Sequence, residues 1–432
     1  MSGLLASLAR TQTALIASAW RIMGIASQSS TMTGSYTTQV LVCDSSTISF
    51  DPEADFPKFT SPHTLASLDT ASQHLHSLQC VAFPTETVYG LGALALDSAA
   101  ASKIFSTKGR PPDNPLIVHV SSLAMLRSIL PNGYTLPESY EVLMKHFWPG
   151  ALTLLFPRDP TRIPEIITAG QPTVAIRMPS HPVARALIAV ANAPIAAPSA
   201  NSSGKPSPTR AEHVRRDLDG KVGIILDGGA CAVGLESTVI DGLNEDGNIR
   251  VLRPGGVTVE EIERVLKAEM KNRIPEVLVH RRDYRDDAME AAPTTPGMKY
   301  RHYSPAVPVI LLLAGADSLP GADAISASSF LEGLAERATD PSRRLKVGVL
   351  AQSDSPLATC TLPKSITWQL YPLGPISDAS VTAHRLFDGL LTLEQEGVDL
   401  ILIEEISEAK EGLAVMNRVR KAAGETQRVI YP

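Results

Sequence analysis

The alternation of two hydrophobic periods most constrains how this chain can fold. Between residues 60 and 260, short β-branched runs such as "NPLIVHV", "TVAIRMP" and "VGIILDGG" alternate with segments of helical period such as "SAAASKIFSTK" and "HPVARALIAVA". Runs of the first kind are typical of buried strands, and those of the second kind are typical of amphipathic helices. Strands that alternate with helices predict an α/β domain with a mixed sheet.

A second α/β domain is expected because 432 residues are too many for one ordinary core. After residue 305, the runs "VPVILLLAG", "LKVGVLAQS", "SITWQLYPLG" and "VDLILIEEIS" are separated by helical patterns, and the last helix is "GLAVMNRVRKAAGE". This order predicts a smaller doubly wound, Rossmann-like domain over residues 306–432. We expect residues 60–272 to form the first domain, whose last helix is capped by Thr258. Residues 273–305 show neither the strand period nor the helix period, so we expect them to form a linker.

Composition excludes several classes of protein. The net charge of −6 and the pI near 6.0 argue against non-specific binding of nucleic acid by the whole surface. The four cysteines lie far apart with no C-x-x-C pair, so neither a zinc site nor a disulfide framework is expected. No apolar run approaches the roughly 20 residues that span a bilayer. We therefore expect no membrane partner.

The first 40 residues differ from the rest of the chain. They are rich in Ser, Thr and Ala, carry Arg10 and Arg21, and contain no acidic residue, since the first acid is Asp44. This pattern is typical of a mitochondrial transit peptide, and a disordered tail accounts for it equally well. The expected compartment is the cytoplasm, with a mitochondrial pool if the segment is a targeting peptide.

Two polar loops could bind phosphate. The chain has no G-x-x-x-x-G-K-[ST] and no G-x-G-x-x-G, so phosphates would need side chains such as Lys108 and Arg110. In "IAAPSANSSGKPSPTRAEH", Ser199 and Asn201 precede a helix expected to be capped near Ser207 or Thr209, and such a helix start can bind an anion. Taken singly, the first loop could be a solvated basic turn and the second could be ordinary turn chemistry.

Nine ordered motifs carry a family resemblance. They are "FPTETVYGLG", "KGRPPDNPLIVHV", "FWPGALTLLF", "VAIRMPSHP", "IAAPSANSSGKPSPT", "ILDGG", "GLESTVIDG", "VLRPGG" and "TPGMKYRHYSP". Together they resemble the YrdC-type threonylcarbamoyl-adenylate synthases over residues 65–305, and the remainder resembles the extra C-terminal domain of the two-domain form. The resemblance implies a YrdC-like twisted mixed sheet with flanking helices in the first domain.

The resemblance also implies a reaction. L-Threonine, bicarbonate or CO2, and ATP would give threonylcarbamoyl-AMP and pyrophosphate, and the product would pass to a transferase that modifies adenosine beside the anticodon of tRNA. The matching catalytic tetrad is Lys108, Arg110, Ser199 and Asn201. The matching ATP contacts are Arg110, Asn114, Thr173, Ser199, Ser207, Arg253 and His302. The matching threonine contacts are Thr87, His119, Arg177, Ala197 and Ser237.

The expected cofactor is Mg²⁺ bound with ATP, and no zinc, flavin or nicotinamide cofactor is expected. Glu86 and Asp97 could be neighbours of the metal, but nothing in their spacing requires it, so the metal ligands stay unassigned. No general base with a dedicated partner stands out. None is required, because the threonine amine can capture CO2 and the resulting carbamate can attack the α-phosphorus.

Two other functions remain open. A non-catalytic RNA-binding module is suggested by basic residues such as Lys205, Arg210 and Arg216, but stacking aromatic residues are scarce around these loops. A weak RNA contact is also compatible with an enzyme. A carbamoyl transferase acting on another protein would need zinc-finger and acylphosphatase-like segments, which the four scattered cysteines do not supply.

The motif "TPGMKYRHYSP" is richer in binding chemistry than a tether requires. We expect it to fold back over the first domain as a lid, with His302 near the nucleotide and Pro296 and Gly297 forming its turn. Such a lid would exclude water from a mixed anhydride that hydrolyses easily. Alternatively, these residues only dock the second domain.

Overall fold

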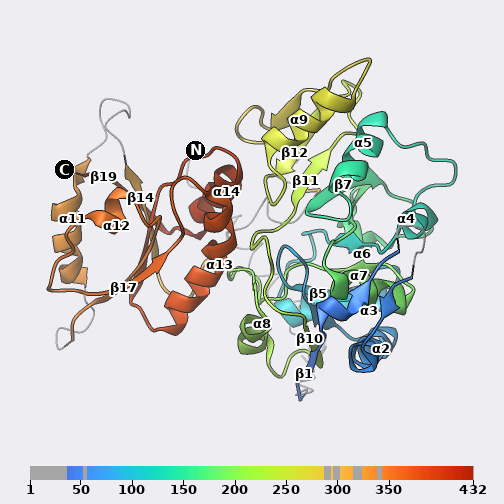
Figure 1. The fold of residues 1–432 in the computed structure, drawn as a ribbon, viewed down its shortest axis with the longest axis horizontal. Helices are drawn as coiled ribbons and strands as arrows, with labels where there is room; N and C mark the ends of the chain where they lie inside the picture. Colours follow the sequence, from blue (N-terminus) through green and yellow to red (C-terminus); the bar gives the residue numbers. More distant parts are fainter. Residues whose placement is uncertain are drawn as a thin grey trace, which may run out of the picture. The chain divides into compact units, whose positions relative to one another are not determined.

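The computed structural model describes residues 37–51, 56–286, 293–294, 302–314, 324–337 and 343–431 (Figure 1). The predicted transit peptide, residues 1–40, therefore lies outside the described residues except for its last four. Strand β1 (Gln39–Val42) begins within that predicted tail and pairs with β10 (Ile224–Asp227). The folded part of the chain thus starts earlier than the predicted boundary.

The first domain is built on a mixed sheet of eleven strands in the order β1-β10-β4-β5-β9-β6-β8-β7-β11-β12-β13. Both parallel and antiparallel pairs occur, as predicted from the alternating pattern. Besides β1 and β10, its strands are β4 (Val81–Phe83), β5 (Gly90–Leu94), β6 (Ile117–His119), β7 (Leu152–Pro157), β8 (Thr173–Arg177), β9 (Ile195–Ala196), β11 (Thr238–Asp241), β12 (Ile249–Arg253) and β13 (Val277–Val279). A two-stranded sheet, β2 (Ile48–Ser49) and β3 (Lys58–Phe59), lies outside it.

Helices cover this sheet and bury two apolar cores. Helices α2 and α7 contribute Leu68, Leu75 and Leu187 to one core. Helices α3, α5 and α9 contribute side chains such as Ile104 and Leu143 to a second, larger core. The helices of this domain are η1 (Ser45–Thr47), α2 (Pro62–His76), α3 (Ser98–Lys108), α4 (Leu123–Ile129), α5 (Glu138–Phe147), α6 (Glu165–Thr168), α7 (Pro182–Ala191), α8 (Ala211–Leu218) and α9 (Val259–Glu269).

The C-terminal domain has a separate parallel sheet in the order β15-β19-β14-β18-β16-β17. Successive residues of β14 face opposite cores: Leu311 packs with the core of α13 and α14, and Leu312 packs with the core of α11. The predicted doubly wound arrangement is confirmed. Its elements are β14 (Val309–Ala314), β15 (Ile325–Ser326), α11 (Ala327–Gly333), η2 (Leu334–Arg337), β16 (Lys346–Ala351), α12 (Pro356–Thr359), β17 (Thr367–Pro372), α13 (Ala379–Gln395), β18 (Leu400–Glu404), α14 (Glu411–Ala422) and β19 (Glu425–Ile430).

Several local predictions can be compared with the structure. Thr258 caps α9 and forms a capping box with Glu261, so that cap is confirmed. The cap predicted near Ser207 or Thr209 is wrong, since α8 follows Arg210 and has no side-chain cap. The backbone N–H of Thr209 instead donates to Nδ1 of His213. An extended stretch through two prolines therefore delays the start of this helix.

Strands β13 and β19 are among those that the sequence did not predict, because their sequences are short or polar. Strand β13 lies inside the predicted linker and extends the first sheet beside β12. Strand β19 follows the helix that was expected to close the chain, and it pairs with β14. Among the described residues, none of the helices is both long enough and apolar enough to cross a membrane.

Gly255 packs closely against the backbone of the first sheet. A Cβ at this position would lie closer than 3.0 Å to backbone atoms of Glu236, Ser237 and Thr238. Glu236 and Ser237 lead into β11, which begins at Thr238, and Gly255 follows the end of β12. Because Gly255 has no side chain, the backbone after β12 can pack directly against the backbone at the start of β11.

We expect Gly255→Ala to lower the midpoint of thermal unfolding, because backbone must move to admit the methyl group, at a cost of about 1–3 kcal/mol. Gly333→Ala is the control, since a Cβ at Gly333 meets no atom within 4 Å. The control should leave the midpoint unchanged or raise it slightly. Equal midpoints for the two variants would contradict this account of Gly255.

Candidate active site

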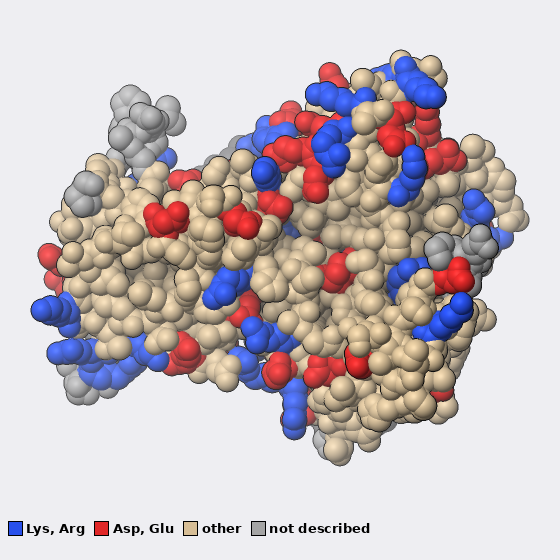
Figure 2. Space-filling view, viewed as in Figure 1, with Lys and Arg blue, Asp and Glu red and all other residues tan. Residues whose placement is uncertain are grey.

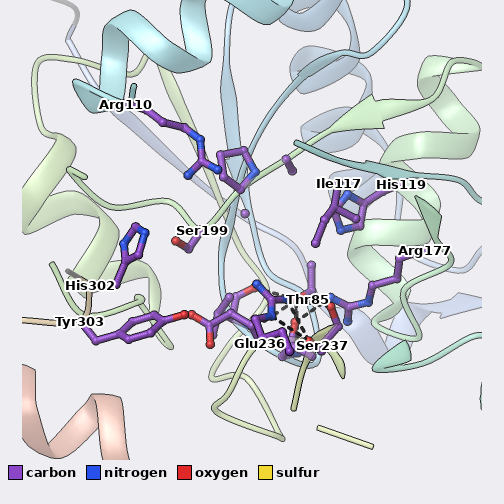
Figure 3. A pocket seen from close by; sticks show the side chains of 16 residues that line it. Thr85, Arg110, Ile117, His119, Arg177, Ser199, Glu236, Ser237, His302 and Tyr303 are labelled. Atoms are coloured by element: carbon purple, nitrogen blue, oxygen red, sulfur yellow. Dashed lines mark hydrogen bonds between the residues drawn. The ribbon is translucent and has the colours of Figure 1, made fainter. Parts of the chain in front are cut away.

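One cavity gathers most of the polar residues that the sequence analysis selected (Figure 3). Its wall comes from the ends of several strands and from the loops beside them. The lining residues are Thr85, Thr87, Val88, Gly90, Arg110, Ile117, His119, Arg177, Ala197, Pro198, Ser199, Glu236, Ser237, Arg253, His302 and Tyr303. Nine of the fourteen predicted site residues are among them.

The end of helix α3 brings Lys108 and Arg110 to this region. Gly109 adopts a left-handed conformation with φ 61°, which ends the helix after Lys108. The backbone N–H of Arg110 donates to the carbonyl of Phe105 at 2.9 Å and closes the turn. The turn at Gly109 changes the direction of the chain, so that Lys108 and Arg110 both lie near the loop that carries Ser199.

Lys108 is buried, and its ammonium donates to the carbonyl oxygens of Ser199 and Asn201. The hydroxyl of Ser199 donates to Oδ1 of Asn201 at 2.5 Å. Burial lowers the pKa of Lys108 well below its usual value, and the charge of Arg110 lowers it further. The four residues of the predicted tetrad are therefore brought together, but Lys108 bonds to the loop that carries Ser199 and does not line the cavity.

Arg110 and Arg253 place two buried guanidinium groups at the cavity. Arg110 donates to the carbonyls of Asn114 at 3.2 Å and Pro115 at 2.9 Å, and burial lowers its pKa to about 10. Arg253, the last residue of β12, donates to the carbonyl of Ser237 at 2.8 Å. Because these acceptors are carbonyls, they orient the guanidinium groups without cancelling their charge.

A second cluster lies at the other side of the cavity, around Arg177 at the end of β8 (Figure 3). Its guanidinium donates to Glu86 at 2.5 Å, to Thr87 at 2.8 Å and to the carbonyl of Gly150 at 3.0 Å. Burial alone would raise the pKa of Glu86, but the charge of Arg177 outweighs it and the pKa is lowered. The carboxylate therefore stays ionised and fixes the arginine.

His119 pairs with Arg177 across parallel strands, because β6 and β8 are in that register. Burial and the charge of Arg177 lower the pKa of His119 to about 3. The imidazole is therefore neutral at physiological pH. It offers the cavity a hydrogen-bonding group without a charge.

Ser237 and Ala197 complete this region. The hydroxyl of Ser237 lies 2.7 Å from that of Thr153 and accepts from Arg253 at 3.2 Å, and Thr153 is the register partner of Arg177 in the pairing of β7 with β8. Ala197 follows β9, and its N–H donates to the carbonyl of Ile117 at 3.0 Å. A small side chain at Ala197 leaves room in the cavity beside that strand.

His302 and Tyr303 reach the cavity from the segment before the C-terminal domain. Burial and the charge of Arg110 lower the pKa of His302 to about 4. The ring of Tyr303 packs against Phe387 of α13, with ring centroids 5.2 Å apart. This much agrees with the expected return of the segment to the first domain. Its closure as a lid stays a prediction, and Pro296 and Gly297 lie outside the described residues.

Three predicted ATP contacts do not line the cavity. Asn114 lies behind Arg110 and accepts from it through its carbonyl. Ser207 is buried and donates its hydroxyl to Glu236 at 2.5 Å, so it lies behind that carboxylate. Thr173 opens β8 at the end opposite Arg177, which places it on the order of 13 Å from the threonine cluster. For these residues a direct contact with ATP stays a prediction.

Sequence analysis selected neither Glu236 nor Tyr303 for the site. Glu236 is buried at 8% exposure and accepts from Ser207 and from Arg418 of α14. The one available signal was an acidic residue inside the motif "GLESTVIDG", directly before Ser237. Its partner Arg418 could not be found in this way, because 182 residues separate the two in the chain.

The carboxylates near the cavity do not form a metal site. Among the described residues, no group of three or more His, Cys, Asp and Glu side chains has the geometry to hold a metal ion. Glu86 is bonded to Arg177 and to the N–H of Ser180, and Asp97 caps α3 through the N–H of Ala100. Both carboxylates already have structural roles, so we assign no metal ligand to the chain.

Two family models match the chain. Residues 73–255 match the family described as "Telomere recombination", and residues 257–424 match the family described as "Threonylcarbamoyl-AMP synthase, C-terminal domain". Curated relatives named "Threonylcarbamoyl-AMP synthase" cover most of the chain. The protein of Schizosaccharomyces pombe is 40% identical over 89% of this chain and 97% of its own length, and that of Pyrococcus abyssi is 43% identical over 80% and 90%.

A solved structure agrees with these matches. The crystal structure of P. abyssi Sua5 complexed with L-threonine is 37% identical and covers 90% of this chain and 99% of its own, with a TM-score of 0.70. The likeness therefore extends over both domains. This chain belongs to the threonylcarbamoyl-AMP synthase family, in the form that carries the additional C-terminal domain.

Proposed function

We propose that the protein forms L-threonylcarbamoyl-AMP and pyrophosphate from L-threonine, CO2 or bicarbonate, and ATP. One observation carries the proposal: a single cavity joins the cluster around Arg177 to the guanidinium groups of Arg110 and Arg253. The first cluster suits the carboxylate and hydroxyl of a small amino acid. The second suits a polyphosphate. The two substrates would meet between them.

The Arg177 cluster is our proposed threonine site. A relative, P. abyssi Sua5, was crystallised in complex with L-threonine. In this chain Arg177 is held in place by Glu86, so its guanidinium can meet a carboxylate without first changing conformation. The neutral His119 and the hydroxyl of Ser237 are polar partners for the remainder of the amino acid.

The chemistry needs positioning more than proton transfer by a dedicated base. The threonine nitrogen forms a bond to the carbon of CO2 and loses a proton, which gives a carbamate. A carbamate oxygen then attacks the α-phosphorus of ATP, and the bond from that phosphorus to the bridging oxygen breaks as pyrophosphate leaves. We propose that Arg110 and Arg253 stabilise the charge on the phosphates during this step.

The proposed ATP would bring its own Mg²⁺ as part of the substrate. No residue of this chain is assigned to the metal, since the described residues form no cluster of metal-binding side chains. The chain's own contribution is the buried positive charge of its arginines. Magnesium would offset the remaining charge of the polyphosphate.

Surface charge favours a small-molecule enzyme over an RNA-binding module. Basic and acidic side chains are intermingled on the face shown in Figure 2. Two of the basic residues that suggested RNA binding are paired: Arg210 with Asp388 at 2.8 Å and Lys205 with Asp217 at 2.8 Å. Neutralised side chains attract phosphate backbones weakly. We propose that the product, not this chain, reaches the tRNA by way of a separate transferase.

The first functional test removes phosphate charge. We expect Arg110→Ala and Arg253→Ala each to lower kcat/KM for ATP by roughly ten- to a hundredfold, because each loses a charge-assisted contact of about 1.5–3 kcal/mol. The assay is pyrophosphate release that depends on both threonine and bicarbonate. Arg250→Ala is the control, since Arg250 is on the same strand as Arg253 but pairs with Asp246. Release without threonine would argue against the proposed reaction.

The second test concerns selectivity for the amino acid. A site that hydrogen-bonds the hydroxyl of threonine should reject valine, which would leave buried polar groups unpaired. We expect valine to react at least a hundredfold more slowly than threonine, with serine between them. Competition assays with the three amino acids measure this order. Equal rates for valine and threonine would contradict the assigned contacts.

The third test concerns the compartment. We propose a cytoplasmic enzyme with an additional mitochondrial pool, because residues 1–40 contain basic residues but no acids. A fluorescent reporter carrying residues 1–40 should enter mitochondria, and translation from Met32 should leave the reporter in the cytosol. Replacing Arg10 and Arg21 by Glu in the reporter is the control. A wholly cytosolic reporter with the native segment would exclude the mitochondrial pool.

A further inference from the structure

Arg418 of α14 carries a guanidinium group that is buried in the protein. Its side chain is 0% exposed. A buried guanidinium needs hydrogen-bond partners and a compensating charge, and its principal ones come from the first domain. Its Nε and Nη2 each lie 3.1 Å from Oε2 of Glu236, and its Nη1 donates to the carbonyls of Pro254 and Ala414.

The partners from the first domain lie in or next to the wall of the cavity. Glu236 lines it, and Pro254 directly follows Arg253. The other carboxylate oxygen of Glu236 accepts the hydroxyl of Ser207. Arg253 donates to the carbonyl of Ser237, the residue next to Glu236. A closed set of bonds thus runs from Arg418 through both strand ends that carry these cavity residues.

The contact of Arg418 with Glu236 also balances the negative charge of that carboxylate. An ionised carboxylate beside the expected polyphosphate would repel it, unless a cation balances that carboxylate. Burial alone would raise the pKa of Glu236, but the charges of Arg418 and Arg253 outweigh it and lower the pKa. The other titratable groups that face Glu236 are Tyr303, His302 and Lys421.

We propose that Arg418 is a positioning residue of the active site, which neutralises Glu236 and holds the strand ends that carry Ser237 and Arg253 toward the nucleotide. The C-terminal domain therefore supplies part of the catalytic apparatus. This inference rests on the proposed function, because it assumes that ATP occupies the cavity.

A simpler role for Arg418 would be to dock the two domains. The chain offers a matched control for that role, because Arg210 of the first domain pairs with Asp388 of α13 at 2.8 Å and does not line the cavity. Losing the Arg210 pair should weaken docking without leaving a carboxylate unpaired beside the nucleotide. The two roles therefore predict different kinetics.

The test compares four full-length variants: Arg418→Met, Arg210→Met, Glu236→Gln and the double variant Glu236→Gln with Arg418→Met. We expect Arg418→Met to raise KM for ATP about tenfold or more, with a smaller change in KM for threonine, and Arg210→Met to change neither appreciably. The double variant should recover at least threefold of the lost affinity, because the unpaired carboxylate is gone. Arg418→Lys, which keeps the charge, should fall between Arg418→Met and the unaltered protein.

The pH profile gives a second readout. As the pH falls, KM for ATP should improve more in Arg418→Met than in the double variant, because protonation of Glu236 removes the repulsion only in the first, whereas Lys421, with a pKa of about 7, gains its proton in both. Equal effects of Arg418→Met and Arg210→Met, or no recovery in the double variant, would overturn the inference. If Arg418→Met fails to fold, the comparison of Arg418→Lys with Glu236→Gln decides.

Binding of a non-hydrolysable ATP analogue separates this inference from the proposed reaction. The same order of affinities, measured by calorimetry, should hold even if the unaltered protein makes no adenylate. In that case the proposed function fails and the role of Arg418 stands. No binding of the analogue by the unaltered protein would overturn both.

Discussion

An imbalance of buried charge governs this structure. Four guanidinium groups, those of Arg110, Arg177, Arg253 and Arg418, are buried in or beside one cavity, and each has fixed acceptors. Only two carboxylates, Glu86 and Glu236, are ion-paired with them among the described residues. The remaining acceptors are mostly backbone carbonyls, which satisfy hydrogen bonds but carry no net charge. The cavity therefore carries an excess of positive charge, which an anionic substrate can neutralise.

The strand ends explain how a sheet can hold such a site. His119 and Arg177 are adjacent because β6 and β8 are parallel and in register. Arg253 and Ser237 come together because β12 runs antiparallel to β11, with Gly255 allowing the close approach of the backbones. Positions fixed by sheet hydrogen bonds are more rigid than positions on free loops. This rigidity lets the arginines stay oriented before any substrate arrives.

The sequence allowed much of this to be predicted, and the failures have physical causes. The alternating periods predicted both sheets, and the ordered motifs located Arg110, Arg177 and Ser199. The short strand β13 and the polar β19 lack a hydrophobic alternation, so only their pairing identifies them. The contact of Glu236 with Arg418 depends on the docking of two domains, and no local pattern encodes it. The hydrogen bonds from Lys108 to the carbonyls of Ser199 and Asn201 likewise could not be predicted, because they depend on how two distant loops pack together.

The two neutral histidines have a consequence for how the protein responds to acidity. His119 and His302 have pKa values of about 3 and about 4, so neither gains a proton between pH 5 and 8. A change of pH within that range therefore leaves the charge of both imidazoles unchanged, whereas Lys421, whose pKa burial lowers to about 7, gains or loses a proton near Glu236. Any variation of rate in that interval would therefore come from Lys421 or from the reactants, through the ionisation of the amino acid's amine and the interconversion of dissolved carbon dioxide with bicarbonate.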